Sequence, residues 1–105
     1  MDNKIKVALV DDHALFRGCI TSVIKDSGYS VHLECNNGKE LIAHLNPNDL
    51  PDVVLMDNNM PEMDGYETTL WLKYNYPSIV IFDTFEACFR YHSVASRCHL
   101  HLFEN

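Results

Sequence analysis

The stretch that decides the fold is VVLMDNNMPEMDG, residues 53–65. Its first four residues are apolar and Asp57 follows at once, a pattern typical of a short strand buried on both faces. Residues 58–63 predict a loop. Asp64 with Glu67 three positions later forms a capping-box pattern, which predicts the start of a helix. This segment therefore predicts strand, loop and helix, with a carboxylate at the carboxyl end of the strand.

The same strand pattern occurs upstream and downstream. The apolar run of residues 6–10 ends in Asp11-Asp12, and the run of residues 79–82 ends in Asp83. Residues 31–35 alternate apolar and polar, which predicts a half-exposed edge strand. Apolar residues at helical spacing predict helices over about 15–24, 38–45 and 64–76, with Gly28 placed to end the first. Strands that alternate with helices predict an α/β fold with a parallel sheet and helices on both faces.

Composition excludes several classes of protein. The 105 residues suit one domain, and 8 Lys and Arg against 15 Asp and Glu give a net charge of −7, which is unsuited to phosphate backbones. No apolar run approaches the ~20 residues of a membrane span, and the first six residues hold no signal-peptide core. We therefore expect a cytoplasmic protein with no membrane or direct nucleic-acid contact. Its four cysteines are expected to be reduced and mostly buried.

Three carboxylates are expected to meet at one edge of this sheet. Ligands of open parallel sheets bind outside the carboxyl ends of the strands, where Asp11, Asp12 and Asp57 stand. Carboxylates this close repel one another unless a cation lies among them, and oxygen ligands suit Mg²⁺. A carboxylate beside such a metal can attack phosphorus. A single strand-end Asp more often caps a helix or solvates a turn, but here the strands at 6–10 and 53–56 both end this way, the first with a doubled Asp.

The residues at both strand ends resemble the receiver domain of bacterial two-component response regulators. The resemblance rests on VALVDDH at 7–13 and on DNNMPEMDG at 57–65, and it covers about residues 4–82. It implies a flavodoxin-like, doubly wound parallel sheet with strand order 2-1-3-4-5. The Asp-Asp-His start is similar to the branch that usually carries a helix-turn-helix output domain, which this chain is not expected to contain.

The resemblance also implies roles for individual residues. Asp57 would accept the phosphoryl group. Asp12, Asp57 and the backbone carbonyl of Asn59 would hold Mg²⁺, with Asp11 acting through water. The partner would be a sensor histidine kinase, whose phosphohistidine donates the phosphoryl group. The chain would then be a signalling domain, with self-catalysed phosphorylation and dephosphorylation at most, and no enzyme of small-molecule metabolism.

The tail departs from the family pattern. Thr84 supplies the hydroxyl expected after the fourth strand, but no Lys follows Lys73 and no Gly follows Gly65. Glu104 stands where the family has a Lys that contacts the phosphoryl group. The chain stops at Asn105, where the last helix should begin. We therefore expect one receiver domain over 1–105 with an atypical tail at 83–105, lacking the last helix.

Two explanations of the tail remain open. In the first, the tail is family sequence in a shifted reading frame, because the codons of residues 82–84, 97–99 and 104–105 allow Leu-Thr, Gly-Ala and Lys one base forward. In the second, the domain is diverged and naturally short; nucleotide sequence near codon 79 distinguishes the two. Without the last helix, exposed apolar surface would favour a homodimer or a swapped oligomer.

The sequence gives less support to other functions. A zinc site is disfavoured because the tail lacks close ligand spacing; its ligands would be Cys88, His92, Cys98, His99 and His101. Aromatic residues 66, 71, 74 and 76 are expected to serve helix packing rather than base stacking. The alternatives to a phospho-acceptor are a degenerate receiver that acts only by protein–protein binding and a non-functional truncated product.

Overall fold

Strands and helices alternate along the chain in the computed structural model, which describes residues 4–57 and 65–83. None of the described helices is long and apolar enough to cross a bilayer. The elements are β1 (Lys6–Val10), α1 (Ala14–Asp26), β2 (Ser30–Cys35), α2 (Gly38–His44), β3 (Val53–Met56), α3 (Gly65–Asn75) and β4 (Val80–Asp83).

The four strands form one parallel sheet in the order β2-β1-β3-β4. This confirms the predicted flavodoxin-like order 2-1-3-4 and the edge position of β2. The pairing of β1 with β3 sets Val10 opposite Met56, so both strands end at the same level. The fifth strand, the last helix and the tail fall on residues 84–105, outside the described part of the chain.

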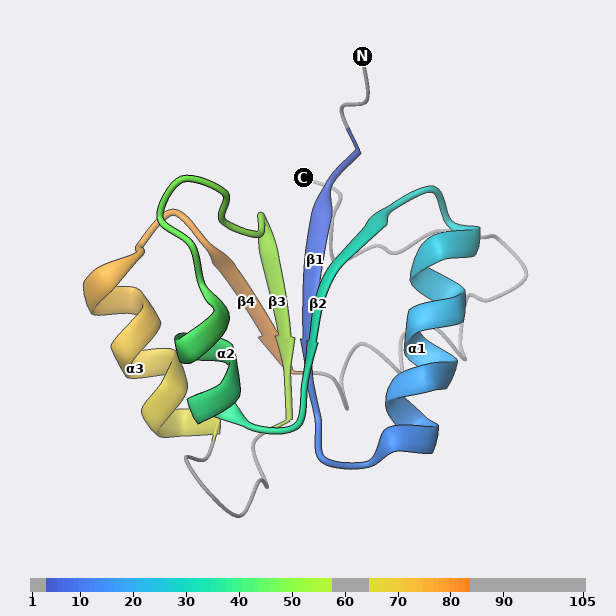
Figure 1. Cartoon of the computed structure of the whole chain (residues 1–105), viewed down its shortest axis with the longest axis horizontal. Coiled ribbons are helices and arrows are strands. Elements are labelled where there is room, and N and C mark those ends of the chain that lie inside the picture. The colour runs from blue at the N-terminus through green and yellow to red at the C-terminus, as the bar shows by residue number, and fades with distance from the viewer. Residues whose placement is uncertain (1–3, 58–64, 84–105) are drawn as a thin grey trace.

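Two apolar cores lie on opposite faces of the sheet. Figure 1 shows α1 on one side of the sheet and α2 with α3 on the other. Side chains of a strand alternate between faces, so Val7 and Leu9 of β1 pack with Ile20 and Ile24 of α1. Their neighbours Ala8 and Val10 belong to the opposite core, which also contains Cys35, Leu41, Val54, Met56, Leu72 and Ile79. This double burial explains why residues 7–10 of β1 and all four residues of β3 are apolar.

Short polar motifs set the helix ends. Gly28 follows the end of α1 with a φ of 91°, a backbone conformation that favours glycine, as predicted. The side chain of Asn37 caps α2 by accepting a hydrogen bond from the backbone N–H of Glu40 at 2.9 Å. Glu40 accepts one in return from the N–H of Asn36, so the turn after β2 is tied to the helix.

Two expectations about burial were wrong. Cys19 is exposed, because the face of α1 toward the sheet is formed by Ile20, Thr21 and Ile24, and at about 100° per residue Cys19 points away from the middle of that face. Tyr66 and Tyr74 are 68% and 88% exposed instead of packed. The buried residues of α3 are Gly65, Thr68 and Leu72.

The two described cysteines should differ sharply toward alkylating reagents. Burial raises the pKa of the Cys35 thiol to about 11, and nearby Glu40 adds to the rise, so at pH 8 only about 0.1% is thiolate. We expect iodoacetamide to modify exposed Cys19 in the native protein and to leave Cys35 unmodified, as located by peptide mass mapping. In urea, where the protein is unfolded, the two cysteines should be modified at similar rates. Similar native rates would contradict the burial of Cys35.

Candidate metal and phosphoryl site

The site begins where β1 and β3 end. Beyond the Val10–Met56 pair, the backbone N–H of Asp57 donates to the carbonyl of Val10 at 2.9 Å, which places Asp57 beside Asp11. The N–H of Asp11 donates to the carbonyl of Cys35 at 3.0 Å, so β2 is tied to the same edge. The carboxyl ends of these strands form the lower edge of the sheet in Figure 1.

The two carboxylates after β1 lie in different surroundings. Asp11 is buried, and its Oδ1 accepts a hydrogen bond of 2.8 Å from the backbone N–H of His13. Asp12 is exposed. The imidazole of His13, also exposed, places Nδ1 3.2 Å from Oδ1 of Asp12 and 3.4 Å from Oδ1 of Asp11. His13 thus lies beside the acidic residues while it faces solvent.

The arrangement provides donor atoms for a cation. One ligand atom each from Asp11, Asp12, His13 and Asp57 lies within 4.8 Å of all the others. Three of the four groups are carboxylates. Their hard oxygen atoms are ligands that Mg²⁺ prefers and that soft metals do not. The structure therefore brings together the three carboxylates that the sequence predicts to converge. Asn59 and Thr84, as well as the tail cysteines and histidines, lie outside the described residues, and their roles stay predictions.

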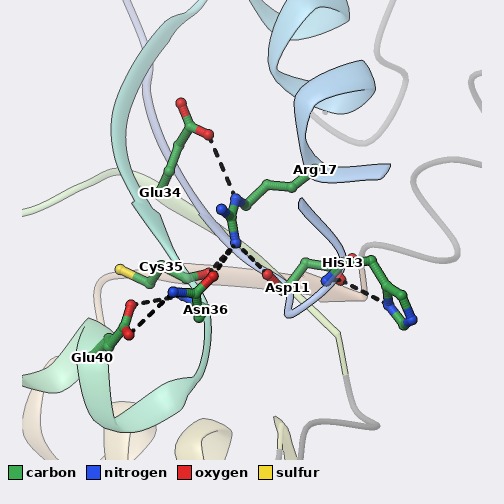
Figure 2. Close-up of polar contacts among 7 residues, drawn as sticks. All are labelled: Asp11, His13, Arg17, Glu34, Cys35, Asn36 and Glu40. Carbon is green, nitrogen blue, oxygen red and sulfur yellow. Dashed lines mark hydrogen bonds and ion pairs between the residues drawn. The ribbon is translucent and has the colours of Figure 1, made fainter. Parts of the chain in front are cut away.

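Sequence reasoning missed a guanidinium beside this site. Figure 2 shows Arg17 of α1 reaching across to the ends of β1 and β2. Its Nη1 donates to the backbone carbonyl of Asp11, to Oδ1 of Asn36 at 2.8 Å and to the carbonyl of Cys35 at 3.2 Å. The available signal is a charge on the buried face of a helix, because Arg17 precedes buried Thr21 by one turn. A charge in such a place needs partners.

The turn after β2 completes the polar surroundings. Both the backbone and the side-chain N–H groups of Asn36 donate to the carboxylate of Glu40, at 2.9 and 3.2 Å (Figure 2). These hydrogen bonds lower the pKa of Glu40. Asn36 thereby joins the α2 cap to Arg17, which in turn contacts Asp11.

Comparison with known proteins identifies the family. A model of the response regulator receiver domain matches residues 7–93. The chain is 34% identical over 84 residues to the transcriptional regulatory protein DegU of Brevibacillus brevis, which covers 76% of this chain and 34% of that protein. It is 36% identical over 74 residues to the chemotaxis protein CheY of Listeria monocytogenes, with coverage of 70% and 61%.

A solved structure agrees with these sequence matches. The chemotaxis protein CheY4 of Vibrio cholerae superposes with a TM-score of 0.67 at 30% identity, covering 74% of this chain and 65% of that one. The chain spans about a third of the length of DegU and three fifths of that of the Listeria CheY. On the strength of the family match, which takes in most of β1, all of β3 and the three residues Asp11, Asp12 and Asp57, this chain belongs to the receiver domain family of two-component response regulators.

Proposed function

We propose that the chain is a phospho-acceptor signalling domain, in which Asp57 takes a phosphoryl group from the phosphohistidine of a sensor histidine kinase. The observation that carries the proposal is the convergence of Asp11, Asp12 and Asp57 at the carboxyl edge of the sheet. Family membership supports it. Asp57 is partly exposed, so an incoming phosphorus atom can approach its carboxylate.

In the proposed reaction, a carboxylate oxygen of Asp57 attacks the phosphorus and forms a new O–P bond. The bond from phosphorus to the donor's imidazole nitrogen breaks, and that nitrogen keeps the electron pair. A bound Mg²⁺ would neutralise charge on the transferring phosphoryl oxygens. Asp12, Asp57 and the backbone carbonyl of Asn59 would hold the ion, with Asp11 acting through water. We further propose, from the sequence pattern, that the Thr84 hydroxyl contacts the phosphoryl group.

Intact-mass spectrometry tests this proposal on the wild-type chain. Incubation with a small acyl phosphate and Mg²⁺ should add the mass of one phosphoryl group, and EDTA should prevent the addition, because charge neutralisation needs the ion. Circular dichroism of the same sample checks that it is folded. A folded sample that gains no mass would contradict phosphotransfer, and a receiver that acts only by binding other proteins would then explain the chain better.

A further inference from the structure

Arg17 clamps the segment that carries two of the proposed cation ligands. It is the fourth residue of α1, and its backbone N–H donates to the carbonyl of His13 at 2.9 Å. Its side chain turns back to the carbonyl of Asp11. The Arg17 side chain therefore holds the Asp11 end of the segment 11–13, and the helical backbone holds the His13 end. Asp12 lies between them, so its backbone position is set by the same two contacts.

The guanidinium also joins this segment to the next loop. Nη1 contacts three oxygen atoms that come from the ends of β1 and β2: the carbonyls of Asp11 and Cys35 and the Oδ1 of Asn36 (Figure 2). Nε lies 3.6 Å from Oε1 of Glu34, and only 15% of the Arg17 side chain is exposed. A planar donor group with this many fixed partners has little freedom to move.

Charge and position predict opposite effects of Arg17 on a bound cation. The positive charge of Arg17, which contacts the backbone carbonyl of Asp11, repels a cation bound nearby, so removing this charge would tighten Mg²⁺ binding if the electric field were all that mattered. If Arg17 instead holds the backbone that carries the metal ligands in place, removing it should weaken Mg²⁺ binding. Loss of groups that orient metal ligands typically weakens metal affinity about 10- to 100-fold. The sign of the change therefore separates the two roles.

We propose that Arg17 is a positioning residue of the acidic site: by holding the carbonyl of Asp11 and the segment 11–13 against the end of β2, it sets the carboxylates of Asp11 and Asp12 for a divalent cation. The proposal rests on the proposed function, because it assumes that this site takes Mg²⁺. Its direct structural consequence is independent of the ion. The hydrogen bond from the His13 N–H to Oδ1 of Asp11 should weaken when Arg17 is lost.

Three variants test the proposal. Arg17→Met removes every donor at similar length, and Arg17→Lys keeps the charge and an ammonium group that is one bond shorter. Glu34→Gln is the matched control, because it changes a partner of Nε and leaves the Nη1 contacts in place. Calorimetric titration with MgCl₂ at constant ionic strength gives the apparent dissociation constant. Hydrogen exchange gives the protection of the His13 amide, with Leu55 of β3 as the internal reference for global unfolding.

We expect Arg17→Met to weaken Mg²⁺ binding about tenfold or more and to speed exchange at His13 while Leu55 stays protected. Arg17→Lys should fall between Met and wild type, and Glu34→Gln should match wild type. Equal or tighter Mg²⁺ binding by a folded Arg17→Met, or unchanged exchange at His13, would overturn the proposal. Should the wild type itself bind no Mg²⁺, the proposed function would fail. Exchange at His13 would still decide whether Arg17 fixes the segment.

Discussion

Asp57→Asn should abolish phosphoryl addition completely. The substitution keeps the shape of the side chain and replaces a carboxylate oxygen, the proposed nucleophile, with an amide that is a poor one. The backbone N–H of residue 57, which donates to the carbonyl of Val10, is unaffected, so the end of β3 should stay in register. Intact mass after incubation with an acyl phosphate and Mg²⁺ should show no gain, against one phosphoryl group for the wild type.

Asp26→Asn is the matched control for this variant. Asp26 is an exposed carboxylate at the last residue of α1, and the acidic site lies at the start of that helix. The same chemical change there should leave phosphoryl addition intact. Peptide mapping of the modified wild type should place the group on Asp57. Full addition to a folded Asp57→Asn chain would mean that another residue accepts the group, and the assignment of Asp57 would then be wrong.

The strands and their acidic ends could be predicted because their sequence pattern is unambiguous. The apolar runs at 6–10 and 53–56 predict buried strands that end in Asp, the receiver resemblance implies that these strands are neighbours, and parallel strands present their carboxyl ends at one edge. The register that pairs Val10 with Met56 then brings Asp11 and Asp57 together without any further information. Local pattern and global fold agree at this edge, which is why the site followed from the sequence.

The buried face of α3 could not be predicted in the same way, because apolar residues occur all round this helix. On α3, Tyr66 and Tyr74, which were expected to serve helix packing, are exposed together with Leu70. Small Thr68 is fully buried, one turn before buried Leu72. Hydrophobicity alone would bury Leu70 before Thr68, which is the reverse of what the structure shows. Burial of Thr68 depends on how α3 lies against the sheet, which the periodicity of a helix does not specify.

The role of Arg17 was out of reach for a different reason. Its partners Cys35 and Asn36 lie 18 and 19 positions after Arg17, at the end of β2. The position of that strand in the sheet was itself only a prediction. Pairwise spacing carries no information about such a contact. The convergence appears only once β2 is placed beside β1 and α1 is placed over the sheet.

Asp12→Asn should reverse the order of stability between wild type and variant when Mg²⁺ is added. Without the ion, carboxylates whose oxygens lie within 4.8 Å repel one another, by about 1 kcal/mol for two charges ~4 Å apart in water. Removing one charge should therefore raise the free energy of unfolding. With Mg²⁺ at a hundred times its dissociation constant, the wild type should gain about 2.7 kcal/mol. The variant should gain much less, because it has lost a proposed ligand.

Urea unfolding at pH 8, with EDTA and with saturating MgCl₂, measures both halves of this prediction. Asp26→Asn should respond to Mg²⁺ as the wild type does, since its carboxylate lies at the far end of α1. An Asp12→Asn chain that gains as much stability from Mg²⁺ as the wild type would show that Asp12 holds no cation. Among the described residues, Asp11 and Asp57 are the other carboxylates of the cluster, so they would be the next residues to test as ligands.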